Sequence, residues 1–311
     1  MTYPNTTLAS LRPPGWFRIA YPDSTVGSLS SSGVVNALFA FPEFDMQVAE
    51  SAGSECADAV RATTAALEEA YDANATATKA LFNVDEDGLT WGADFWYMVA
   101  DSAAMAVQYG NKASLCEPLT AAYEAGEDLV TTFATVTNDV WGDSFGSDCF
   151  YDSNCLADSG SSDRWQLTAR SWRWQKCFQL AYFQVAPEEG SLRSARVDMQ
   201  YHLDQCDKVF GAGTTDPEAA TAAWNAKMGG DKPQEENTFF ANGSDDPWQQ
   251  ASISPLDSDS ETEPAVLAVC DSCGHCGDLH APSSSQPANL TAQQEAITSY
   301  VAKWLMTAPQ Q

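Results

Sequence analysis

The chain is poor in basic residues. It contains 15 Lys and Arg against 43 Asp and Glu, and three His, which gives a formal net charge of -28. Nucleic-acid binding needs clustered Lys and Arg to neutralise phosphates, so the composition excludes a nucleic-acid partner. It excludes an anionic membrane surface for the same reason. The acidity indicates either a well-solvated surface, which is the simpler interpretation, or a protein suited to an acidic compartment.

Long apolar runs and a targeting segment are also lacking. No run of about 18 apolar residues occurs, so the sequence predicts no membrane-spanning helix. The N-terminus, M-T-Y-P-N-T-T-L-A-S, has no basic segment followed by an apolar run and predicts no signal peptide. Yet nine Cys and the N-x-S/T sequons at Asn5, Asn74, Asn242 and Asn289 are typical of a secreted protein or of a lysosome- or vacuole-like compartment. Of these, Asn74 and Asn289 are the candidate glycosylation sites.

The hydrophobic pattern changes along the chain and predicts an α/β fold. Val26 to Phe41 is apolar and rich in small residues, which favours a strand buried on both faces and a tight loop after it. From about Phe44 the pattern becomes helical. Two apolar runs, 238–241 and 265–269, predict buried strands, and an amphipathic helix capped by Thr291 closes the chain. This order of elements favours a sheet with a helical insert over an all-helical protein.

Residues suited to acid–base chemistry follow the last two predicted strands. Asp246 comes after the first strand and His275 after the second. In α/β-hydrolases the triad acid and the triad histidine occur in this order at consecutive strand ends. There the histidine accepts the nucleophile's proton, and a buried aspartate orients the ring and stabilises the imidazolium. The pattern therefore makes Asp246 and His275 a candidate acid–base pair.

The segment C-D-S-C-G-H-C-G-D-L-H has a second interpretation, as a metal site. Cys270, Cys273, Cys276 and His280 are residue types that bind tetrahedral zinc, at short intervals. Against zinc, His275 lies inside the same loop, and secretory conditions favour disulfides over free thiolates. We therefore predict no metal site and no cofactor, and we interpret the cysteines as bridging a histidine loop.

Five segments resemble, in the same order, those of the prolyl carboxypeptidase, dipeptidyl peptidase II and thymus-specific serine protease family. N-G-S-D-D-P-W around Asp246 resembles N-G-x-x-D-P-W, and G-H-C-G-D-L around His275 resembles S-H-C-x-D-M or A-H-H-x-D-L. S-W-R-W-Q-K-C, from Ser171, resembles the family's W-x-x-Q-x-C helix, and Y-H-L-D-Q-C-D-K-V-F-G, from Tyr201, resembles its partner segment. Residues 15–35 are similar to the stretch that follows the family's nucleophile.

The resemblance implies a partial α/β-hydrolase fold with an inserted helical cap. Residues 1–43 and 163–311 are then parts of the hydrolase core, and residues 44–162 are the cap. The implied activity is that of a serine-type exopeptidase that hydrolyses peptide bonds near proline. In that mechanism Asp246 is the triad acid and His275 the triad base.

The resemblance also implies a disulfide between Cys177 and Cys206. The sequence leaves the pairing of the other cysteines open: Cys56, Cys116, Cys149 and Cys155 alone allow three connectivities. The pairing around His275, among Cys270, Cys273 and Cys276, is open as well.

The family's nucleophile motif, G-G-S-Y-x-G, is not found where it is expected. Its serine would fall at Leu8, and nearby Ser10 lacks the flanking glycines that allow a strained nucleophile elbow. Pro13 and Pro14 also disfavour a helix behind a nucleophile. We therefore expect a C-terminal portion of such a peptidase, or an inactive relative, without turnover of its own.

The alternative function is that of a non-catalytic, secreted peptide-binding homologue. Trp172, Trp174 and Gln175 are the candidate peptide-contacting residues, with ordinary core packing as the competing interpretation. The predicted partners are a peptide substrate and, as one option, a second copy of the chain in a homodimer.

Overall fold

The computed structural model describes residues 14–233, 236–256, 258 and 261–307. The chain is an α/β protein that divides into two compact units. The first, here called the sheet unit, comprises Met1–Ala37 and Ala222–Gln311; the second, the helical unit, comprises Leu38–Thr221. Within the described residues no helix is both long and apolar enough to cross a membrane.

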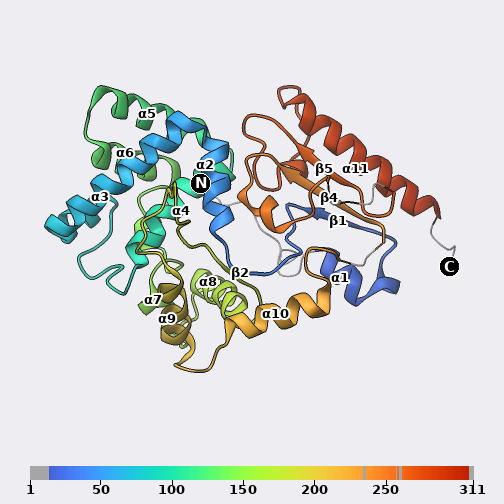
Figure 1. Cartoon of the computed structure of the whole chain (residues 1–311), viewed down its shortest axis with the longest axis horizontal. Helices are drawn as coiled ribbons and strands as arrows, with labels where there is room; N and C mark the ends of the chain where they lie inside the picture. The colour runs from blue at the N-terminus through green and yellow to red at the C-terminus, as the bar shows by residue number, and fades with distance from the viewer. Residues whose placement is uncertain (1–13, 234–235, 257, 259–260, 308–311) are drawn as a thin grey trace. The chain divides into compact units, whose positions relative to one another are not determined.

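The sheet unit contains three parallel strands in the order β1-β4-β5 (Figure 1). They are β1 (Ser28–Ser31), β4 (Thr238–Gly243) and β5 (Ala265–Ala268). The central strand, β4, is buried along its whole length, which explains the uninterrupted apolar run Phe239-Phe240-Ala241. Because parallel strands run in one direction, the residues that follow all three strands meet at one edge of the sheet.

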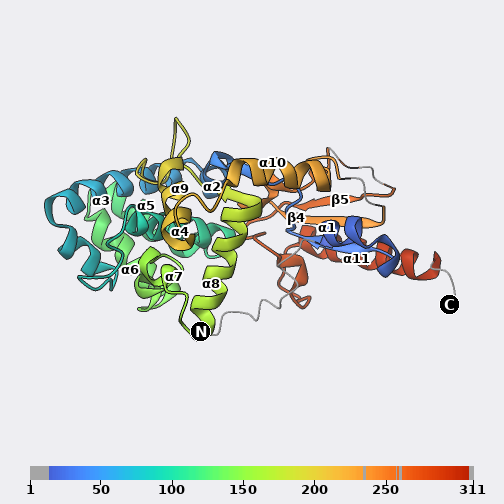
Figure 2. The same cartoon turned by 90° about the horizontal axis from the view of Figure 1, so that it is seen from below.

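Helices cover the sheet and fix the position of β4. The long C-terminal helix α11 (Ala288–Thr307) packs on β4 and β5, and in Figure 2 it lies on the same side of the sheet as α1 (Pro14–Ala20). Trp304 of α11 is buried against Phe239 of β4. The other helical segments of this unit are η2 (Pro22–Ser24), most of α10 (Pro217–Met228), η5 (Pro247–Ala251) and η6 (Gly277–Leu279).

The sequence predicts a strand followed by a tight loop over Val26 to Phe41, and the chain forms two short strands there, separated by a turn. After β1, Ser32 adopts a left-handed backbone conformation with φ 45°, which ends the extended run. The chain then leaves the sheet unit, and β2 (Leu38–Ala40) pairs in parallel with β3 (Ala181–Phe183) in the helical unit. Apolar composition alone did not reveal this break.

The helical unit consists mainly of packed helices. Three of them, α3, α5 and α6, pack pairwise, and α4 is buried along almost its whole length. The helices of the first half are α2 (Pro42–Ala52), α3 (Ser54–Leu81), α4 (Asp94–Gln108), α5 (Lys112–Ala125) and α6 (Leu129–Trp141). Those of the second half are η3 (Phe145–Ser147), α7 (Ser153–Ala157), α8 (Arg164–Gln175), the π-helical turn η4 (Lys176–Leu180) and α9 (Met199–Phe210).

The helical unit extends further than the insert expected from the sequence. The expected insert, 44–162, lies inside it, but the unit continues to Thr221. The physical reason is packing: Ala169 of α8 and Val209 of α9 form a buried cluster with Leu156 of α7. α8 and α9 therefore share a buried cluster with α7, which lies inside the expected insert.

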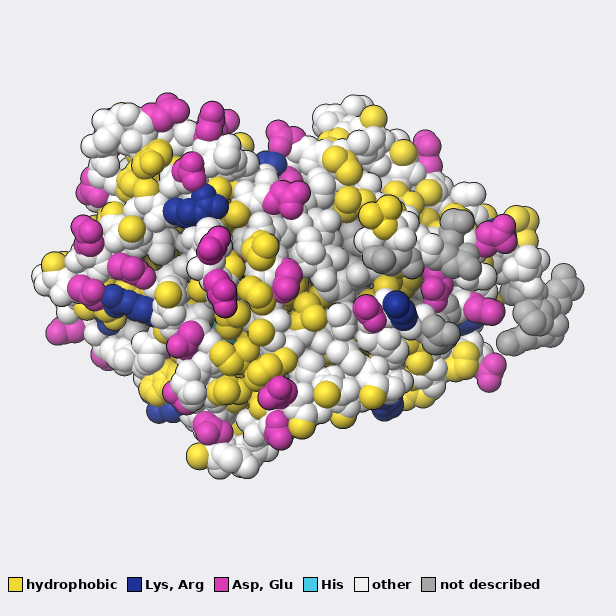
Figure 3. Space-filling view, viewed as in Figure 1, with side chains coloured by type: hydrophobic (Ala, Val, Ile, Leu, Met, Phe, Trp, Pro, Cys, Tyr) yellow, Lys and Arg dark blue, Asp and Glu magenta, His cyan; other side chains and the backbone are white. Residues whose placement is uncertain are grey.

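Four disulfides are formed in the described residues. One joins Cys177 to Cys206, the pair that the family resemblance implied. The pairings that the sequence left open are Cys56–Cys116, Cys149–Cys155 and Cys270–Cys273, and Cys276 has a free thiol. The surface is strongly acidic, as Figure 3 shows by the many Asp and Glu side chains scattered over the visible face.

The two points where the chain passes between the units lie side by side in the sheet unit. The side-chain amide of Asn225 donates to the Ala37 carbonyl at 2.7 Å, and the Ala37 N–H donates to the Asn225 Oδ1 at 2.9 Å. One amide side chain thus satisfies both backbone groups of Ala37. The helical unit is inserted with its two ends held together.

Candidate active site

Asp246 is held rigidly just beyond the end of β4. Its side chain is fully buried, and its Oδ1 accepts a hydrogen bond from the Trp248 N–H at 3.0 Å, which caps η5. Pro247 occupies the first position of η5, where its fixed φ suits a helical turn. The second carboxylate oxygen, Oδ2, is directed at His275.

The loop that carries His275 rests on the same strand end. The Asp245 N–H donates to the Cys273 carbonyl at 2.9 Å, and the Ser272 N–H donates to the Asp245 Oδ2 at 2.9 Å. Gly243, the last residue of β4, allows this approach, because a Cβ there would lie 2.2 Å from the Cys273 carbonyl oxygen. The loop therefore packs against β4 through backbone contacts that a side chain at Gly243 would block.

The imidazole of His275 and the carboxylate of Asp246 form a close pair. The distance from His275 Nδ1 to Asp246 Oδ2 is 2.9 Å, and the His275 side chain is 25% exposed while that of Asp246 is 0% exposed. A buried carboxylate at this distance selects the tautomer with a proton on Nδ1 and leaves Nε2 to exchange protons with a reactant. The geometry is that of an acid–base pair in which the carboxylate is buried and the imidazole is partly exposed to solvent.

The pKa of His275 reflects a balance between burial and its partner. Burial acts to lower the pKa, but the negative charge and hydrogen bond of Asp246 outweigh it and raise the pKa well above its ordinary value. A raised pKa favours the protonated ring, which pairs with the Asp246 carboxylate. It becomes available as a base as the pH rises through the raised pKa.

The cysteines beside His275 do not form a metal centre in this structure. Cys270 and Cys273 are joined in a disulfide, so their thiolates are not available as ligands. Among the described residues no group of three or more His, Cys, Asp or Glu is arranged to hold a metal ion. The zinc interpretation therefore has no support from the geometry.

The segment expected to hold a nucleophile, with Leu8 and Ser10, lies outside the described residues. One G-x-S-x-G pattern does occur in the chain, at residues 142–146, and its serine is Ser144. However, Ser144 follows α6 and begins a 3-10 turn on the surface of the helical unit. A nucleophile elbow needs a strand before the serine and a helix after it, so this pattern lacks the required context.

The candidate peptide-contacting residues lie on α8, in the helical unit. Trp174 is 43% exposed and stacks on Phe178 with ring centroids 5.3 Å apart, whereas Gln175 is buried. Trp172 is half-buried. The three side chains therefore do not form one exposed surface, and Trp174 is the member best placed to meet a ligand.

The candidate glycosylation sites differ in accessibility. Asn74 and Asn289 are exposed, although the Asn289 Nδ2, to which a glycan would be attached, donates to the Val269 carbonyl at 2.5 Å. Asn242, on the strand against which the loop of His275 packs, is buried, and its Nδ2 donates to the Ile253 carbonyl at 3.1 Å. Asn242 is thus a structural amide with no room for a glycan.

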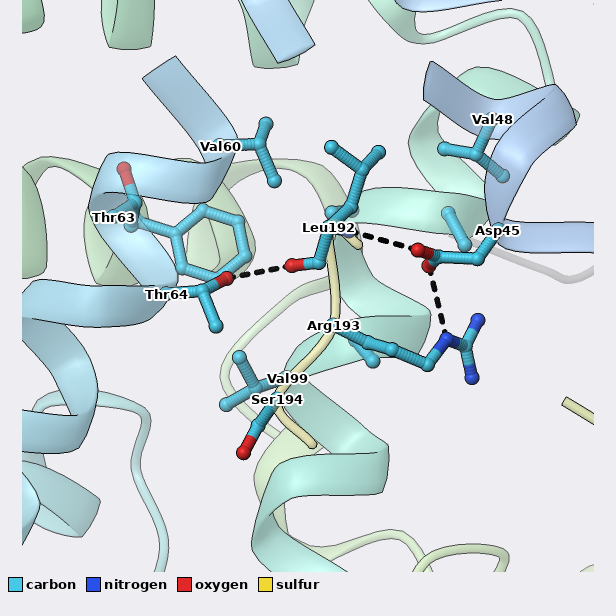
Figure 4. Close-up of a pocket in the computed structure, with 13 residues that line it drawn as sticks. Asp45, Val48, Val60, Thr63, Thr64, Val99, Leu192, Arg193 and Ser194 are labelled. Carbon is cyan, nitrogen blue, oxygen red and sulfur yellow. Dashed lines mark hydrogen bonds and ion pairs between the residues drawn. The ribbon is translucent and has the colours of Figure 1, made fainter. Parts of the chain in front are cut away.

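A small pocket in the helical unit is shaped by structural contacts. Figure 4 shows Asp45 accepting hydrogen bonds from the Leu192 N–H at 2.8 Å and from the Arg193 Nε at 2.9 Å. Thr64 donates to the Leu192 carbonyl at 2.7 Å. These bonds tie the segment 191–194 to the neighbouring helices.

Comparison with known proteins gives the family. Residues 9–297 match the family model described as serine carboxypeptidase S28. The chain is 37% identical over 296 residues to "Probable serine protease EDA2" of Arabidopsis thaliana, covering 93% of this chain and 57% of that protein. It is 26% identical over 136 residues to the thymus-specific serine protease of Mus musculus, covering 44% of this chain and 26% of that protein. The chain thus spans less than two thirds of the length of these relatives, and it belongs to the serine carboxypeptidase S28 family.

Proposed function

We propose that the chain supplies the acid–base pair of a serine-type exopeptidase that hydrolyses peptide bonds near proline. The observation that carries this proposal is the 2.9 Å contact between His275 Nδ1 and the fully buried Asp246 carboxylate, at adjacent strand ends of a parallel sheet. The sheet unit is then part of an α/β-hydrolase core, and the helical unit is its cap.

In this mechanism the two residues have distinct roles. Nε2 of neutral His275 takes the proton of a serine hydroxyl while that oxygen attacks the peptide carbonyl, and the resulting imidazolium then protonates the leaving amine. Asp246 keeps the Nδ1 proton in place and stabilises the imidazolium, but it is not itself protonated. The serine belongs to a G-G-S-Y-x-G segment, which in this family precedes the stretch resembling residues 15–35.

The setting of the site is consistent with a secreted or lysosome-like peptidase. Four disulfides stabilise both units, as expected for an oxidising environment. The proposal includes a peptide substrate, contacted by Trp172, Trp174 and Gln175. It also includes glycans on Asn74 and Asn289, and a homodimer.

Two preparations test the function. The first is the 311-residue chain, assayed with fluorophosphonate labelling and Xaa-Pro dipeptide reporters; we expect neither labelling nor turnover, because the sequence contains no G-G-S-Y-x-G. The second is a fusion in which the N-terminal part of the Arabidopsis relative precedes Gly15. We expect this fusion to be labelled and to hydrolyse the reporters, with both activities lost in His275→Gln and Asp246→Asn. Labelling of the 311-residue chain that depends on His275 would show that a serine of this chain is the nucleophile.

The alternative is a peptide-binding protein without chemistry. It is favoured by the exposed, stacked Trp174. Isothermal titration of the 311-residue chain with proline-containing peptides distinguishes the two functions. Binding that is weakened by Trp174→Ala, together with an inactive fusion, would favour the binding protein.

A further inference from the structure

The loop that carries His275 is contacted by residues at the end of β1 as well as by Asp246. The Cys276 N–H, one residue beyond His275, donates to the Ser32 Oγ at 2.8 Å. Ser31 makes two further contacts with the same loop: its hydroxyl donates to the Asp278 Oδ1 at 2.5 Å, and its carbonyl accepts from the Cys276 Sγ at 3.7 Å. Two adjacent serines therefore contact two of the three residues that follow His275, namely Cys276 and Asp278.

The backbone at this junction is in a conformation that side-chain-bearing residues rarely adopt. Ser32 has φ 45° and Cys276 has φ 55°, both in the left-handed region. Such conformations persist only where the surrounding contacts hold them. Ser32 is held by its own N–H, which donates to the Ala241 carbonyl of β4 at 2.7 Å. The sheet thus fixes Ser32, and Ser32 in turn fixes the turn at Cys276.

The position of the imidazole depends on the backbone of residues 275 and 276 as well as on the contact between Nδ1 and Asp246. The bond from Cys276 N–H to Ser32 Oγ restrains that backbone, because it fixes the peptide plane directly attached to His275. The two contacts together set where Nε2 is presented.

We propose that Ser32, assisted by Ser31, is a positioning residue that keeps His275 aligned with Asp246. The proposal rests on the function proposed above, since it concerns the orientation of the same imidazole. The proposal gives a role to the S-S-S-G segment at the end of β1. Ser32 is buried, and its hydroxyl oxygen is the acceptor that the Cys276 N–H needs there.

The test is an NMR titration of His275 in the 311-residue chain. With three His in the sequence, selective histidine labelling and a His275→Gln variant assign the resonance. We expect Ser32→Ala to weaken the signal of the hydrogen-bonded Nδ1 proton and to lower the His275 pKa by ~0.5 unit or more, because the ring spends less time against Asp246. Ser31→Ala, which removes only the Asp278 contact, should give a smaller shift in the same direction.

Ser30→Ala is the matched control. Ser30 lies in β1, two positions before Ser32, and is fully buried, yet its hydroxyl has no hydrogen-bond partner among the described residues, so its removal should leave the His275 titration unchanged. If Ser32→Ala does not fold, Ser32→Gly replaces it, because glycine tolerates the positive φ but also lacks the hydroxyl. An unchanged His275 pKa and Nδ1 signal in the folded Ser32 variant, or an equal change in Ser30→Ala, would overturn the proposal. The NMR titration requires no peptidase activity. An inactive fusion would therefore count against the proposed function without deciding whether Ser32 positions His275.

Discussion

The Asp246→Asn variant tests the acid–base pair most directly. Asparagine has nearly the same shape and can still accept the hydrogen bond from the Trp248 N–H, so the cap of η5 is kept. What is lost is the negative charge opposite His275. A charge-assisted hydrogen bond contributes about 1.5–3 kcal/mol and a neutral one about 1 kcal/mol, so we expect a loss of about 1–2 kcal/mol in the free energy of unfolding while His275 is protonated.

The pH dependence of that loss has a definite sign. The pKa of His275 is raised in the folded state, so the stabilisation is fully present below the unfolded pKa of about 6.5 and is lost as the pH rises through the folded pKa. The variant should therefore be more destabilised relative to the parent at pH 6 than at pH 9. In the variant, burial without a counter-charge should place the His275 pKa below its ordinary value.

Urea unfolding followed by near-UV circular dichroism, at pH 6 and pH 9, measures the first expectation, and NMR titration of His275 measures the second. A parallel His275→Gln variant is the control, because combining it with Asp246→Asn should add little further destabilisation if the two residues act as a pair. A destabilisation that is equal at both pH values, or a His275 pKa unchanged by Asp246→Asn, would refute the ion pair.

Three further perturbations follow from the structure. Burial raises the pKa of Asp94 to about 6, although its hydrogen bonds act to lower it, so the free energy of unfolding falls as the pH rises from about 4 to 6. Asp94→Asn should therefore flatten the dependence of stability on pH over that range. An unchanged slope in urea unfolding would contradict this expectation. Replacing both Cys177 and Cys206 by Ser should lower the free energy of unfolding by about 2–5 kcal/mol, measured by urea unfolding; a loss well below that range would mean that the buried contacts hold the two helices without the bridge. Gly243→Ala should displace the Cys273 carbonyl and with it the histidine loop, which the Nδ1 proton signal of His275 reports; an unaltered signal would show that the loop adapts.

The candidate site could be predicted because its determinants are local in the sequence. Asp246 and His275 each follow a short apolar run, and parallel strand ends must meet at one edge. That reasoning anticipated two elements of a sheet and the residues beyond them, and the structure places the two side chains 2.9 Å apart. The family resemblance added the implied pairing of Cys177 with Cys206.

Other features depend on tertiary contacts and left no local signal. The sequence predicted a strand and a tight loop within 26–41, but it did not indicate that the strand ends at a left-handed Ser32 or that a second short strand follows. The helical unit extends past residue 162 because α8 packs beside α7 and α9, which only side-chain contacts in space can show. The role of Ser32 was hidden for the same reason, since its partner, Cys276, is 244 positions away.

The paired crossings at Ala37 and Asn225 bear on how the protein is made. Ser28 and Thr238 are neighbours in the sheet but 210 positions apart, so during synthesis β1 emerges long before its partner strand exists. Closing so long a loop is slow when the intervening chain is disordered. A folded insert whose ends are brought together at Asn225 reduces the disordered part of that loop to a few residues. Nascent chains should therefore complete the helical unit first, and β1 gains its partner β4 only when the last third of the chain is translated.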